Sequence, residues 1–264
     1  MKLGDVTSKI PNSLLYSFLN TPIGRKIYKT HLQNTRSVTI QCDDLTFKID
    51  VPSNPVHWWD DFDDGGCHEW VTTRTFSQIL KRSEQPVVWD IGSKFGYFMM
   101  VSSNYTSPGN IHVFEADSAH ASVISLNNRL YLENNATVNN NRVTDSSNDG
   151  EISGDQYLRH HNCPDLIKID VDGPEADVVT GMSETITSYS PDLLIEIHSG
   201  DDIVEKSTRI DNVLSNNHYE YSVCTNHRST GGEWDSMSDI SQISEVDDDL
   251  LLKCSSSQFK FNPE

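Results

Sequence analysis

The chain has 264 residues, of which 36% are hydrophobic and 22% charged, and its formal net charge is −19 at neutral pH. That length fits one large domain, or one domain with an extension, and suffices to bury a substantial core. The acidity argues against a surface for nucleic acid or anionic membranes, because phosphate binding needs clustered Lys and Arg, which the chain lacks. The 26 Asp against 13 Glu and 11 Lys indicate a protein kept soluble in high salt, so we expect a halophilic source.

Cysteine usage and hydropathy predict a cellular compartment. The five cysteines (Cys42, Cys67, Cys163, Cys224 and Cys254) are odd in number and show no C-x-x-C spacing. We therefore expect reduced thiols in a cytoplasmic protein. No apolar stretch approaches the roughly 20 residues that a membrane-spanning helix needs.

The N-terminal part of the chain predicts helices, a hairpin and an acidic loop. Residues 14–32 carry a broken helical stripe of apolar residues. Residues 37–41 and 45–51 alternate apolar and polar side chains and predict a β-hairpin. Residues 57–70 (HWWDDFDDGGCHEW) form a loop whose two tryptophans either stack on a flat substrate or pin the loop to the core. Its acids are more typical of a solvated loop than of a cation site, and a helix is expected over 69–82.

A strand, a glycine turn and a helix follow, in residues 86–100 (PVVWDIGSKFGYFMM). Gly92 and Gly96 bound the turn, which would let the backbone approach a ligand at the helix N-terminus. The next strand, 111–114, ends in Glu115, where nucleotide-binding folds place a carboxylate on ribose hydroxyls. Lys94 stands where the dinucleotide fingerprint has its second glycine, which argues against NAD. Asp90, two residues before the first glycine, points instead to S-adenosylmethionine (SAM).

A second chemical signature lies at the ends of two further strands. Strand 166–171 carries Asp170, and strand 192–197 is followed by His198. Because ligands bind at the carboxyl ends of parallel strands, Asp170 and His198 are the candidates for a catalytic base, orienting group or ligand. Together with Glu196 they form a candidate Mg²⁺ site. We expect Lys168 to pair with an acid inside the fold.

The other predicted elements follow the same alternation of helix and strand. They are helix 119–132, strand 136–138, polar loop 139–154, a short helix to residue 159 capped by Asp155, helix 203–216, strand 219–224, strand 250–254 and a loosely ordered tail.

Four segments, WDIGSKFGYF, VFEAD, PDLIKIDVDGPE and LLIEIH, resemble the FkbM family of SAM-dependent methyltransferases. The resemblance spans about 65–255 and implies a Rossmann-like α/β fold with a seven-stranded, mostly parallel sheet whose last strand is antiparallel. Residues 1–64 would be a helical and hairpin extension, as in archaeal members, and 256–264 a tail. The sequence departs from the family pattern at Ser93 and Lys94, for Ala-Asn, at Ala116, for Pro, and at Asp172, for Glu.

The resemblance also implies a function and a set of site residues. It implies methyl transfer from SAM to a hydroxyl of a glycan, glycolipid or natural-product-like acceptor. The expected cofactor contacts are Asp90, Gly92, Ser93 and Gly96 at the methionine part, Glu115 at the ribose, and Asp145 near adenine. Two alternatives stay open: a degenerate SAM-fold protein acting as a scaffold, and an NAD-linked oxidoreductase.

Overall fold

The computed structural model describes residues 35–52, 66–200, 202–217, 219–240, 243 and 249–256. The predicted helical stripe over 14–32, the tryptophans at 58 and 59, and the tail beyond 256 lie outside the described residues. Within the described part of the chain, no helix has the length and apolar character needed to cross a bilayer.

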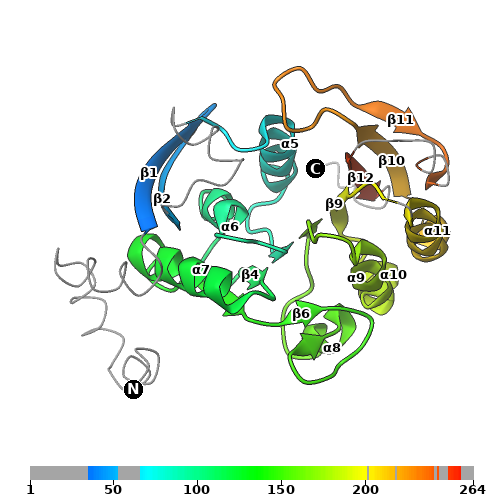
Figure 1. The fold of residues 1–264 in the computed structure, drawn as a ribbon, viewed down its shortest axis with the longest axis horizontal. Helices are drawn as coiled ribbons and strands as arrows, with labels where there is room; N and C mark the ends of the chain where they lie inside the picture. Colours follow the sequence, from blue (N-terminus) through cyan, green and yellow to red (C-terminus); the bar gives the residue numbers. More distant parts are fainter. Residues whose placement is uncertain are drawn as a thin grey trace.

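A central sheet organises the molecule (Figure 1), and its strand order is β11-β10-β12-β9-β8-β3-β4-β5. Strands β5, β4, β3, β8 and β9 are parallel neighbours, whereas β12 lies antiparallel between β9 and β10. The strands are β3 (Val88–Ile91), β4 (Ile111–Phe114), β5 (Ala136–Asn139), β8 (Leu166–Ile169), β9 (Asp192–Ile197), β10 (Tyr219–Cys224), β11 (Asp235–Met237) and β12 (Leu250–Ser256).

The predicted α/β fold class is confirmed, with one correction to the strand count. The sheet has eight strands rather than seven, because the short β11 pairs with β10 through residues 235–237. Sequence reasoning treated this segment as a polar stretch, since its strand DSM has neither β-branched residues nor a buried apolar face. The order of the parallel strands reverses between β3 and β8, which places the ligand crevice at the carboxyl ends of these two strands.

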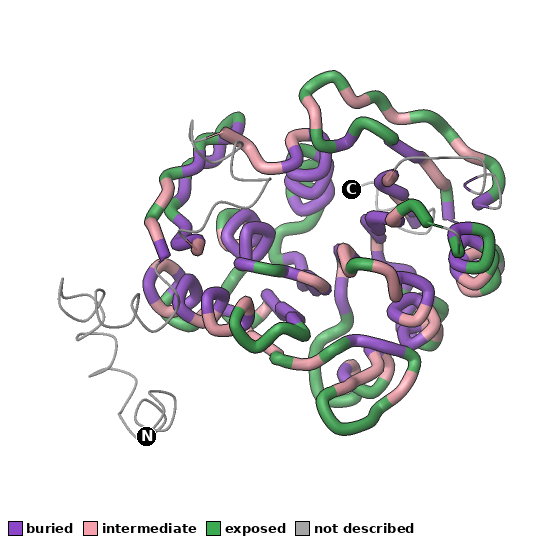
Figure 2. The backbone as a smooth tube through the Cα atoms, in the orientation of Figure 1, coloured by how far each residue is buried: buried purple, intermediate pink, exposed green. Residues whose placement is uncertain are grey.

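Helices cover both faces of the sheet (Figure 1). They are α5 (Trp70–Leu80), α6 (Tyr97–Ser102), α7 (Ser118–Tyr131), α8 (Gly154–Leu158), α9 (Glu175–Thr180), α10 (Ser183–Tyr189) and α11 (Ile203–Leu214). Alternate residues of a strand enter different cores: Val88 packs with the helices α5–α7, whereas Trp89 and Ile91 pack with α8–α11. Figure 2 shows the resulting burial of the strands and of the inner helix faces. This two-sided burial accounts for the mostly apolar sequences of these strands.

The predicted hairpin is confirmed as β1 (Thr35–Cys42) and β2 (Leu45–Pro52). Hydrogen bonds of one buried side chain join the hairpin to the rest of the domain. The side chain of Asn127 on α7 accepts a hydrogen bond from the Asp50 backbone N–H (2.7 Å) and donates to the carbonyl oxygens of Asp50 (2.8 Å) and Phe95 (2.9 Å). Because Asn127 is fully buried, these bonds replace the water that its amide loses.

Two local expectations were wrong. Cys42 and Cys67 form a disulfide rather than two free thiols, because the hairpin returns to α5 and brings their Cα atoms to 4.9 Å. Asp155 does not cap α8: Ser153 does, accepting from the backbone N–H of Gln156. The Asp155 carboxylate instead accepts from the first turn of α10, including the Thr185 N–H at 2.7 Å.

Candidate active site

The glycine turn after β3 touches the end of β8. Gly92 has φ +84°, and a Cβ placed there would lie 1.8 Å from the carbonyl oxygen of Asp170. Only glycine permits both that conformation and that approach. The turn continues through Lys94, which also has a left-handed φ of 57°, at a cost of about 1 kcal/mol for a side-chain-bearing residue. The position that sequence analysis singled out as a departure therefore keeps the turn geometry.

Glu115, at the end of β4, is held in place by two backbone donors. Its Oε2 accepts from the Lys94 N–H and its Oε1 from the Asp117 N–H, both at 2.8 Å. The residue is 8% exposed. Each carboxylate oxygen keeps a further lone pair, so this carboxylate can accept two more hydrogen bonds side by side, as a vicinal diol requires.

Three of the predicted cofactor residues support the turn rather than the cavity. Asp90 is fully buried and accepts a hydrogen bond from the Ser93 hydroxyl. Burial raises the pKa of Asp90 to about 6. Gly96 closes the turn by donating its N–H to the Ser93 carbonyl at 2.9 Å. Neither Asp90 nor Gly96 is among the residues that line the cavity at the carboxyl ends of β3, β4 and β8, and their contact with the methionine part of SAM stays a prediction.

A cavity of about 470 Å³ opens at the carboxyl ends of β3, β4 and β8. Its lining includes Gly92, Glu115 and Asp170. Asp145 is not among the lining residues: its carboxylate lies 3.6 Å from Arg209 of α11. The cavity is instead bordered by the nearby residues Asn141, Arg142 and Val143. The expected position of the Asp145 segment near adenine stays a prediction.

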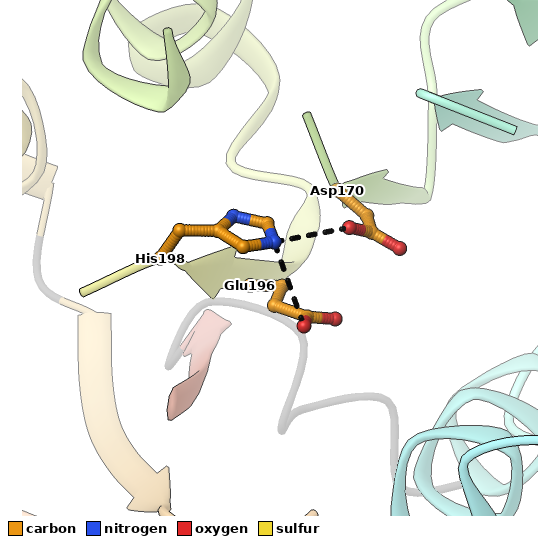
Figure 3. A group of neighbouring side chains, drawn as sticks. All are labelled: Asp170, Glu196 and His198. Atoms are coloured by element: carbon orange, nitrogen blue, oxygen red, sulfur yellow. Dashed lines mark ion pairs between the residues drawn. The ribbon is translucent and has the colours of Figure 1, made fainter. Parts of the chain in front are cut away.

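The candidate catalytic residues do meet (Figure 3). Strands β8 and β9 run parallel with Ile169 opposite Ile195, so Asp170 follows β8 beside the end of β9 that carries Glu196. The Nε2 atom of His198 lies 4.0 Å from Asp170 Oδ1 and 3.8 Å from Glu196 Oε1. Asp170 lines the cavity as well, so it connects the cavity to His198.

Glu175, in the first turn of α9, orients the imidazole of His198. Its Oε1 lies 2.7 Å from His198 Nδ1 and accepts from the His198 backbone N–H at 3.1 Å. Glu175 is fully buried, and Lys206 Nζ lies 3.3 Å from its Oε2. The Glu175 hydrogen bond raises the pKa of His198 to about 9. Sequence analysis missed Glu175 as the partner of His198, because the two residues lie 23 positions apart and no local pattern connects them.

Permanent cations surround the two strand-end carboxylates. Lys168 is 1% exposed and donates to Asp170 Oδ2 at 2.8 Å, as the sequence predicted for an acid inside the fold. Burial raises the pKa of Asp170, but Lys168 outweighs burial and the net effect is a lowered pKa. Arg228, on the loop between β10 and β11, pairs with Glu196 Oε1. Sequence analysis missed Arg228, because no pattern connects that loop to β9.

Asp170, Glu196 and His198 therefore bring three potential metal ligands together, with one ligand atom from each within 4.8 Å of the others. In the described arrangement these donors do not fit a divalent ion. Asp170 is bonded to Lys168 and Glu196 to Arg228, so a protein cation already contacts each of the two carboxylates.

Comparisons with known proteins found several solved structures that are similar to this chain. Among solved structures, the chain is similar to an FkbM methyltransferase from Methylobacillus flagellatus (17% identity, 67% of this chain and 47% of that chain, TM-score 0.48). It is also similar to a putative O-methyltransferase from Klebsiella pneumoniae (14%, 97% and 96%, TM-score 0.48). A third is the O-methyltransferase from Bacillus cereus in complex with SAH (14%, 70% and 80%, TM-score 0.47). The chain thus spans about half the length of the Methylobacillus protein.

No curated protein matches the chain. The family whose model matches is described as the methyltransferase FkbM domain, and the match covers residues 135–221. This segment contains Asp170, Glu196 and His198, and it includes the two motifs PDLIKIDVDGPE and LLIEIH. The predicted resemblance to the FkbM family is confirmed for this segment, which matches the model of the methyltransferase FkbM domain.

Proposed function

We propose that this protein transfers a methyl group from SAM to a hydroxyl oxygen of a glycan, a glycolipid or a natural-product-like acceptor. One observation carries the proposal. The cavity that begins at Glu115 continues to Asp170, and Asp170 lies beside the Nε2 atom of His198. A nucleoside-type ligand seated on Glu115 would therefore present its far end to an acid and an imidazole.

The cavity suits a cofactor that carries net positive charge. Its lining offers the carboxylates of Glu115, Asp117, Asp170 and Asp172, against the basic side chains of Lys94 and Arg142 and the imidazole of His120. Glu115 is preoriented by two backbone N–H groups, so it can receive paired hydroxyls without reorganisation. When bound, SAM supplies a methyl group that its sulfonium charge has already activated.

The protein's part is then to align the acceptor and remove its proton. A neutral hydroxyl is a poor nucleophile, so its O–H proton must leave as the new C–O bond forms. His198 in its deprotonated form is the proposed base: Glu175 occupies its Nδ1 side, which leaves Nε2 directed at the Asp170 end of the cavity. Asp170 is the proposed orienting group for the acceptor hydroxyl and for the imidazolium that forms.

Mg²⁺ was the other cofactor that the sequence left open. The cation-filled cluster argues against it, so the proposed reaction uses protein groups alone. We expect EDTA to leave both SAM binding and methyl transfer unchanged. A rate that falls with EDTA and returns with Mg²⁺ would contradict this part of the proposal.

The test of the cofactor is calorimetric titration of SAM, and separately of NADH, into the protein in molar KCl. We expect SAM to bind and NADH not to bind. Glu115→Gln should weaken SAM binding by about tenfold to a hundredfold, because an amide NH₂ would face one of two backbone N–H donors and leave it unpaired. Glu184→Gln, an exposed change of the same charge on α10, is the matched control.

Each outcome of that titration separates the hypotheses. SAM binding that weakens in Glu115→Gln but not in Glu184→Gln supports the methyltransferase and justifies screening glycan acceptors. A folded protein that binds no SAM refutes the proposal. NADH binding would then favour the oxidoreductase, and binding of neither ligand would favour the scaffold.

A further inference from the structure

Glu196 is a buried carboxylate with a partner supplied from a distant loop. It is 1% exposed, and its Oε1 contacts the Arg228 guanidinium and lies 3.4 Å from His227 Nε2. Its Oε2 is buried and has no hydrogen-bond partner among the described residues. Burying a carboxylate is costly unless a cation or donor compensates it. Arg228 is the permanently charged residue that provides this compensation.

The loop holds Arg228 in place from two sides. Its Nη1 lies 3.5 Å from Asp249 Oδ2, and Asp249 Oδ1 in turn accepts from the Ser199 backbone N–H at 2.8 Å. The carbonyl of the preceding residue, His227, accepts from the Val71 N–H at 3.1 Å, which ties the loop to α5. Asp249 therefore holds the guanidinium, and the Val71 N–H holds the loop that carries it. Half of the Arg228 side chain stays exposed to solvent.

A divalent ion and Arg228 compete for the same oxygen. The Nε2 atom of His198 lies 4.0 Å from Asp170 Oδ1 and 3.8 Å from Glu196 Oε1. An octahedral Mg²⁺ with ligands at about 2.1 Å would need adjacent donor atoms about 2.9 Å apart. Moving the three ligand atoms together to that spacing would place the divalent ion on Glu196 Oε1, directly against the Arg228 guanidinium. Like-charge repulsion opposes this for as long as Arg228 stays.

We propose that Arg228 is the resident cation of the Asp170–Glu196–His198 cluster: it fills the place of a divalent ion on Glu196 and turns the cluster into a latent metal site. This inference rests on the proposed function, because it takes this cluster to be the catalytic one. It deepens that function by naming the cation that the cluster holds. It implies that a single substitution in a loop outside the family's matched segment converts a metal-free site into one that binds a metal.

The test measures Mn²⁺ binding by the loss of the free-ion EPR signal, in molar KCl to suppress loose binding by surface acids. The variants are Arg228→Met, which keeps an aliphatic stem, and Arg228→Lys, which keeps the positive charge. We expect Arg228→Met to bind one Mn²⁺ at least tenfold more tightly than the wild type, and Arg228→Lys to resemble the wild type. Adding Glu196→Gln to Arg228→Met should abolish the new site.

Equal Mn²⁺ affinity in the wild type and Arg228→Met, whether tight or weak, would overturn the inference. Tight binding that survives Glu196→Gln would overturn it too, because the ion would then lie elsewhere. If Arg228→Met does not fold, as near-ultraviolet circular dichroism would show, Arg228→Gln gives the same comparison. SAM titration of the same samples keeps the two proposals apart, since a wild type without SAM binding contradicts the proposed function but leaves the Mn²⁺ comparison valid.

Discussion

Replacing Glu175 by Gln tests whether this buried carboxylate sets the proton affinity of His198. The substitution keeps the size of the side chain and an oxygen that can accept from the His198 backbone N–H. It removes the negative charge 2.7 Å from His198 Nδ1. We expect the pKa of His198 to fall from about 9 to its ordinary 6.5 or below. Burial lowers this pKa, and without the Glu175 charge only the other nearby acids raise it.

The magnitude follows from those two values. The difference between about 9 and 6.5 corresponds to about 3 kcal/mol in favour of the charged imidazole in the folded state. Because this pKa is raised on folding, the stability that it contributes is fully present below pH 6.5 and is lost as the pH rises through 9. The difference in unfolding free energy between wild type and Glu175→Gln should therefore shrink by up to about 3 kcal/mol between pH 6 and pH 10.

Two measurements report the effect. Histidine-selective ¹⁵N NMR follows the ring nitrogens through a pH titration, with His198→Gln identifying the resonance among ten histidines. Chemical denaturation at several pH values gives the unfolding free energies. The control is Glu184→Gln, an exposed carboxylate on α10, which should leave both results unchanged. A His198 that titrates alike in wild type and Glu175→Gln, or a stability difference independent of pH, would refute the reasoning.

Further predictions concern the turn, the disulfide and the reaction itself. Gly92→Ala should destabilise the fold by at least about 2 kcal/mol and abolish SAM binding, because its Cβ would collide with a backbone carbonyl. The control Gly109→Ala has φ +89° and open space around it, so it should cost only about 1 kcal/mol and leave SAM binding intact. Denaturation measures the stability and calorimetry the binding. Replacing both Cys42 and Cys67 by Ser removes a cross-link over a sequence separation of 25, worth about 3.5 kcal/mol in chain entropy. The double variant should melt several degrees lower, and dithiothreitol should lower the melting temperature of the wild type alone. For methyl transfer, kcat/KM should rise with pH up to about 9 as His198 loses its proton, and a profile that falls between pH 7 and 9 would contradict its role as base.

The parallel core of the sheet could be predicted from the sequence because its information is local. Strand 166–169 is apolar except for Lys168 and is bounded by turn residues, and the acid that follows it indicates the ligand edge of the sheet. The convergence of Asp170 with His198 followed from strand parallelism alone. What could not be predicted lies in contacts between segments far apart in the chain, for which a single sequence carries no signal.

Glu175 and Arg228 illustrate this limit. Glu175 reads as a helix-start acid, and only the packing of α9 beside β9 shows that it bonds His198. Arg228 lies in a loop of polar residues and reaches Glu196 across 32 positions of sequence. Asp145 gives a third case: the sequence does not show that its carboxylate lies 3.6 Å from Arg209 of α11 and is not among the residues that line the cavity. The disulfide was missed because the odd cysteine count was interpreted as a set of unpaired thiols.

The amide of Asn127 has a consequence for how this protein can be divided. It joins the second hairpin strand, at Asp50, to the carbonyl of Phe95 inside the glycine turn. A truncation that removes the hairpin would deprive the Asn127 amide of its partners at Asp50 and so weaken the support of the glycine turn. We therefore expect a chain cut at residue 65 to be less stable than one that keeps β1 and β2, although the sequence alone predicts a boundary there.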